Sequence, residues 1–104
     1  MAGGSSATWY MRPNGNGELA VGATEVQGPS RPCRAVKIKA NLANTDNVYV
    51  GTATGVTVPN AATDTTTGFP LDAGQELELL TDNLDRLWFI GGAASQAISY
   101  ILYT

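Results

Sequence analysis

Few side chains in this chain have the chemistry needed for catalysis or metal binding. The 104 residues include no histidine and one cysteine. Acid–base catalysis usually depends on histidine or on paired carboxylates, and transition-metal sites need clustered Cys or His. The densest acidic group, Asp82, Asn83 and Asp85, offers oxygens for Ca²⁺, but its spacing matches no EF-hand and a strand-capping turn explains it more simply. We therefore expect a protein that is not an enzyme and has no metal or cofactor.

Four of the six basic residues lie close together in the sequence, at Arg31, Arg34, Lys37 and Lys39. On one strand edge they could dock an acidic protein surface or prevent edge-to-edge pairing. The alternative is a solvated strand face, because lysines that alternate with Val and Ile are typical of any half-exposed strand. The net charge of −3 argues against a nucleic-acid partner, which would require a basic surface.

Large apolar side chains suggest a second kind of site. Trp9, Tyr10 and Met11 stand between a tail of small residues and the Asn/Gly-rich segment 13–17, which predicts a turn or hinge. This aromatic cluster could form an edge strand, contact a neighbouring subunit or belong to a disordered arm. Trp88 lies inside the most apolar run, so we expect it in the core or in a subunit interface rather than in a sugar-stacking site.

Most of the chain alternates short apolar runs with turns rich in Gly, Pro, Asn and Asp, which is typical of an all-β domain. In the clearest strand, residues 33–42, Val36, Ile38, Ala40 and Leu42 share one face and the lysines share the other. Further strands are expected at residues 18–27, 48–51, 55–58, 76–80, 86–90 and 95–103.

These runs predict an all-β fold of about eight strands, a two-sheet antiparallel β-sandwich of jelly-roll or Ig-like order. Residues 1–17 are expected to form a flexible N-terminal arm and hinge, and residues 18–104 the β-sandwich domain. Cys33 opens a strand after Pro32, which predicts a buried structural thiol. We expect no membrane association and synthesis in the cytoplasm, because no secretory signal and no apolar run of about 20 residues is evident.

The second half of the chain also resembles a known group of proteins. The segments VYVG (48–51), GFPLDAGQEL (68–77), NLDRLWFIG (83–91) and ISYI (98–101) are similar to those of small structural β-sandwiches of tailed bacteriophages. The resemblance covers about residues 36–104. Its motifs are turns and strands, so it assigns no functional residue.

The resemblance implies a virion structural protein, most like a capsid decoration or cement protein that binds the outer surface of the major capsid protein. Such a protein would be made in the host cytoplasm and located on the capsid exterior. The aromatic segment at Trp9 and Tyr10 would join subunits, with a homotrimer favoured over a homodimer. The alternative is a tail- or fibre-associated module whose polar loop, near residues 63–68, binds a host-surface glycan or protein.

Overall fold

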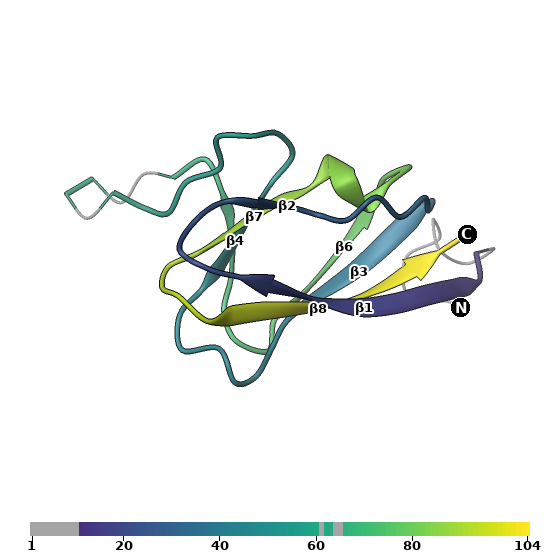
Figure 1. Ribbon diagram of the computed structural model, residues 1–104, viewed down its shortest axis with the longest axis horizontal. Helices are drawn as coiled ribbons and strands as arrows, with labels where there is room; N and C mark the ends of the chain where they lie inside the picture. The colour runs from purple at the N-terminus through teal and green to yellow at the C-terminus, as the bar shows by residue number, and fades with distance from the viewer. Residues whose placement is uncertain (1–10, 61, 64–65) are drawn as a thin grey trace.

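The computed structural model describes residues 11–60, 62–63 and 66–104, and this part of the chain forms eight strands and one 3₁₀ turn (Figure 1). None of its helices is long or apolar enough to cross a membrane. The elements in chain order are β1 (Pro13–Val21), β2 (Val26–Gln27), β3 (Ala35–Ala40), β4 (Val48–Gly51), β5 (Phe69–Leu71), β6 (Glu76–Leu80), η1 (Leu84–Arg86), β7 (Trp88–Gly91) and β8 (Gln96–Tyr103).

The strands form two antiparallel four-stranded sheets, in the orders β1-β8-β3-β6 and β2-β7-β4-β5. The pairs β1–β8, β2–β7, β3–β6 and β4–β5 are nested, as if one long hairpin had been rolled up. The two-sheet β-sandwich predicted from the sequence is confirmed. Of the two strand orders left open, this one is the jelly roll.

The core lies between the two sheets and is built from their alternating inward side chains. Val36, Ile38 and Ala40 of β3 are fully buried, as the alternation in residues 33–42 predicts. They lie in one apolar cluster with residues of the opposite sheet such as Phe89. The expectation for Leu42 is wrong: β3 ends at Ala40, and Leu42 lies in the following turn with 77% of its surface exposed.

The predicted strand 18–27 and the predicted hinge 13–17 are both wrong in their boundaries. Residues 13–21 form one strand, β1, and only Val26–Gln27 pairs with the other sheet. The Asn/Gly-rich segment is a bulge within β1, because its residues 13 to 16 lie opposite only Ile101 to Tyr103 of β8. Gly15 takes a φ of 121° there, which explains why a turn-like sequence occurs inside a strand.

The predicted strand 55–58 is a loop in the structure, and β5, which the sequence did not suggest, follows it. The loop has its own anchors. The Glu25 carboxylate accepts hydrogen bonds from the backbone N–H groups of Gly55 (2.6 Å) and Val56 (2.8 Å). Thr57 and Thr67 also bond to each other's backbone N–H groups through their hydroxyls. These side-chain bonds replace the strand pairing that residues 55–58 lack.

Gln96, at the start of β8, is the one buried polar side chain recorded in the described part of the chain, with 2% of its surface exposed. Its Oε1 accepts hydrogen bonds from the N–H groups of Thr45 (2.8 Å) and Asp46 (3.1 Å). Its Nε2 donates to the Thr45 hydroxyl (3.1 Å) and the Ala94 carbonyl (2.7 Å). The three bonds to Thr45 and Asp46 hold the β3–β4 turn against β8, and the bond to Ala94 lies within the β7–β8 turn.

We therefore expect Gln96→Leu to lower the free energy of unfolding by about 2–4 kcal/mol, because it leaves the turn's N–H groups without partners. Urea denaturation measures the loss. The matched control is Gln27→Leu, since Gln27 is exposed and makes a single bond, to the Asp85 carbonyl. That change should cost less than about 1 kcal/mol. Equal losses in the two variants would contradict the role given to Gln96.

Candidate functional site

The outer faces of the two sheets differ in how far the chain itself covers them. On the β2-β7-β4-β5 sheet the loop after β4 packs Val56 against Gly51, and Tyr49 is buried although it alternates with inward residues. The outer face of the β1-β8-β3-β6 sheet, here called the open face, has no such loop among the described residues. It consists of Asn16, Glu18 and Ala20 of β1, Ala97, Ser99, Ile101 and Tyr103 of β8, Lys37 and Lys39 of β3, and Glu76, Glu78 and Leu80 of β6. Ala35 of β3 follows the same alternation but is fully buried.

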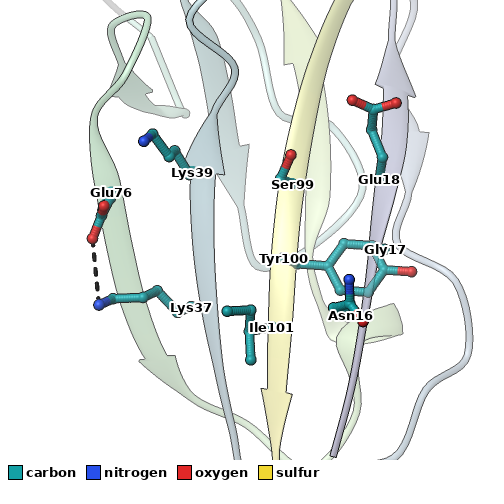
Figure 2. Close-up of a pocket in the computed structure, with 9 residues that line it drawn as sticks. All are labelled: Asn16, Gly17, Glu18, Lys37, Lys39, Glu76, Ser99, Tyr100 and Ile101. Atoms are coloured by element: carbon teal, nitrogen blue, oxygen red, sulfur yellow. Dashed lines mark ion pairs between the residues drawn. The ribbon is translucent and has the colours of Figure 1, made fainter. Parts of the chain in front are cut away.

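Strand register arranges the open face in rows that cross the sheet. Glu18 of β1 and Lys39 of β3 both pair with Ser99 of β8, so the three side chains lie in one row. Asn16 and Lys37 likewise both pair with Ile101. Figure 2 shows the two rows one above the other, with β8 in the middle. Each row therefore has a different chemical group on each side of β8.

A groove of about 550 Å³ runs over the middle of these rows. Its floor is low because Ser99 is small, whereas Glu18 and Lys39 are long side chains on the two neighbouring strands (Figure 2). Ile101, 41% exposed, adds an apolar surface to the floor. The residues that line the groove are Asn16, Gly17, Glu18, Lys37, Lys39, Glu76, Ser99, Tyr100 and Ile101.

Hydrogen bonds fix one wall of the groove more firmly than the other. The Ser99 hydroxyl donates to Asn41 Oδ1 (2.7 Å), and Asn41 Nδ2 donates to a Glu18 carboxylate oxygen (2.6 Å). On the other wall Lys37 pairs with Glu76 at 3.4 Å, a half-exposed contact worth less than about 1 kcal/mol. Lys39 makes no ion pair with any described carboxylate. Glu18 is thus held in place, and Lys39 is free to bind.

A second surface lies at the end of the sandwich where the chain begins and ends. The backbone N–H of Thr104 donates to the Arg12 carbonyl there (2.9 Å). Leu80, 64% exposed, ends β6 in the same row of the sheet as Tyr103. Beside it a hollow of about 400 Å³ is lined by Leu79, Leu80 and Leu87 together with polar neighbours. We call this surface the β6 corner.

The structure separates most of the site residues expected from the sequence. Lys37 and Lys39 share the open face. The Arg31 guanidinium instead donates a hydrogen bond to the hydroxyl of Tyr100 (3.5 Å), a buried residue of β8. Arg34 is exposed just before β3, and Trp88 is half-buried on the outer face of the other sheet. Met11 is half-buried before β1, whereas Trp9 and Tyr10 lie outside the described residues.

The acidic segment after β6 has structural partners. The Asp82 carboxylate pairs with Arg86 (3.0 Å). The Asn83 side chain accepts from the N–H groups of Arg31 (2.9 Å) and Asp85 (3.0 Å), so it caps the 3₁₀ turn. Within residues 11–60, 62–63 and 66–104 no group of three His, Cys, Asp or Glu side chains is placed to hold a metal ion.

The sequence did not point to Glu18, Ser99 and Ile101 as site residues. Alternation along residues 95–103 does place Ser99 and Ile101 on one face of a strand. It does not show that β8 lies between β1 and β3, and only that placement brings Glu18 and Lys39 to either side of Ser99.

Cys33 is buried, as predicted, and its thiol donates to the Thr81 carbonyl (3.4 Å). Burial, and to a smaller extent the nearby Asp82 carboxylate, raise the pKa of the Cys33 thiol above its usual range. The thiol is therefore poorly suited to act as a nucleophile at neutral pH.

Because the pKa of Cys33 is higher in the folded than in the unfolded chain, its neutral thiol favours folding below about pH 9. That contribution is lost as the pH rises through the folded-state pKa. We expect the thermal unfolding midpoint of the wild type to fall more steeply than that of Cys33→Ala as the pH rises from about 8.5 to about 10.5. This range starts at the usual thiol pKa of about 8.5 and extends above it. Parallel curves for the two proteins would show that the thiol has no part in the pH dependence.

In comparisons with protein-family models, curated proteins and solved structures, no match to the chain was found. The two surfaces described above are therefore interpreted from their own geometry.

Proposed function

We propose that the chain is a non-enzymatic virion structural protein that binds the outer surface of a tailed-phage capsid and stabilises contacts between capsomers. The observation that carries the proposal is the β6 corner. It places an exposed leucine, beside a hollow lined by three leucines and four polar residues, at the end of the sandwich where β1 begins. Exposed apolar surface of this kind is typical of protein–protein contact sites.

The polar groups of the open face support binding rather than catalysis. The Ser99 hydroxyl donates to the Asn41 amide oxygen, so it is not paired with a base that could activate it. The β6 corner is small, and a single contact through it would be weak. On a capsid, many copies bound to a repeating lattice and linked to one another would multiply such weak contacts. The sequence resemblance alone favours a homotrimer over a homodimer, joined through Trp9 and Tyr10 rather than through the open face.

The direct experiment is co-sedimentation of the purified protein with expanded heads of the parent phage that lack it. We expect saturable binding at a fixed ratio to the major capsid protein. Leu80→Glu should weaken this binding at least about tenfold, because it places a charge in an apolar contact. The matched control is Leu42→Glu: Leu42 is 77% exposed and follows the opposite end of β3, so its binding should equal that of the wild type.

Failure of the folded wild-type protein to sediment with heads would refute capsid binding. If the wild type binds and the two leucine variants bind equally well, the protein attaches to heads through another surface. Far-UV circular dichroism of both variants checks that each is folded.

The N-terminal segment provides a further test of the same proposal. Removal of residues 1–11 should weaken head binding, since Trp9 and Tyr10 are the large aromatic residues that directly precede Met11 in the sequence. Removal of residues 1–7 alone, which are small or polar apart from Met1, is the control and should change binding little. Unchanged binding after removal of residues 1–11 would limit the capsid contact to the β-sandwich.

A tail- or fibre-associated module that binds a host-surface glycan is the second candidate. The loop between β4 and β5 favours it, because this loop projects from the sandwich (Figure 1) and is held by bonds from Glu25 and between Thr57 and Thr67. A polar loop on a fixed base is a suitable binding element. Specific binding to a glycan array without binding to heads would favour this function over the first.

A further inference from the structure

The charges of the open face make it complementary to itself. Glu18 and Lys39 flank Ser99 in one row, one strand to each side of β8. Neighbouring strands are about 4.8 Å apart, so the carboxylate strand and the ammonium strand are equally distant from β8. A rotation of 180° about an axis parallel to β8 therefore brings Glu18 of one copy opposite Lys39 of a second copy, and the reverse.

We propose that the open face is the interface of a two-fold symmetric homodimer whose axis runs parallel to β8. Facing sheets pack about 10 Å apart, a gap that a glutamate and a lysine can span together. The symmetry produces the Glu18–Lys39 pair twice. This inference goes beyond the proposed function, because it names the partner of a surface that capsid binding does not use.

The other rows agree with the same axis. Ile101 lies on β8, so the two copies of this half-exposed side chain meet at the axis above the groove floor. Asn16 of one copy then faces Lys37 of the other. This contact brings no like charges together, because Asn16 is neutral and Lys37 is already paired with Glu76. An axis perpendicular to the strands would instead place β1 opposite β1 and β3 opposite β3, so like charges would meet.

The position of the axis also determines which surfaces of each copy stay accessible in the dimer. Only β1, β8 and β3 overlap with the second copy, and β6 lies outside the overlap because it is two strands from β8. Leu80 and the β6 corner are therefore accessible in the dimer. Since the rotation preserves the direction of β8, both β6 corners and the starts of both β1 strands lie at the same end of the dimer. Two copies could thus attach side by side to one surface.

Three overlapping strands form a small interface, near or below the roughly 1,200 Å² of the smallest stable complexes. We expect a reversible dimer with a micromolar dissociation constant, measured by sedimentation equilibrium of the isolated protein without heads. Glu18→Lys or Lys39→Glu should each weaken dimerisation about tenfold or more, because each variant opposes like charges twice. Glu78→Lys, on β6 outside the overlap, is the matched charge-reversal control and should dimerise as the wild type does.

Charge exchange gives the decisive result. The double variant E18K/K39E restores both ion pairs and should dimerise nearly as well as the wild type. An equimolar mixture of E18K and K39E should form a heterodimer more tightly than either variant dimerises alone, since every Lys then faces a Glu. A wild type that stays monomeric at millimolar concentration, or single variants that dimerise normally, would overturn the proposal. So would failure of both exchange experiments. Head binding is measured separately, so either proposal can fail without the other.

Discussion

The structure depends on one long-range pairing, in which the last strand, β8, lies between the first strand, β1, and the third, β3. Register contacts such as Leu19 with Ile98 join residues from opposite ends of the chain. Closing such large loops costs chain entropy before the new hydrogen bonds and buried surface can compensate. The β1-β8-β3-β6 sheet is therefore complete only when residues 96–103 have joined it. Gln96 supports this step, because its buried amide binds the β3–β4 turn to the start of β8.

The two sheets have different surfaces because their strands differ in length. β2, β4 and β5 are short, and the first part of the connection after β4 lies against its own sheet, where the Glu25 carboxylate binds the N–H groups of Gly55 and Val56. β1 and β8 are the longest strands and span the whole sandwich. The outer face that they build stays uncovered by the described chain. Potential binding groups are consequently concentrated on one sheet and at the end where the chain begins and ends.

On the open face, the pattern of charges matters more than their number. An exposed Glu–Lys pair contributes little free energy by itself. The pair instead contributes to orientation, since opposite charges at equal distances from one strand favour a single orientation of a facing partner. Apolar contact at Ile101 is small by comparison. The face is therefore better suited to define how two surfaces align than to bind them tightly, and tight attachment would come from many copies acting together.

The sequence by itself determined the fold class, the inward face of residues 35–40 and the buried state of Cys33. These features follow from alternation, composition and turn chemistry, which are local. It did not determine the bulge at Gly15, the loop in place of strand 55–58, or the jelly-roll order. Alternation indicates which face of a strand is buried but not which strand lies beside it. Only the tertiary structure, by inserting β8 between β1 and β3, placed Glu18 and Lys39 on opposite sides of Ser99 and so created the open face.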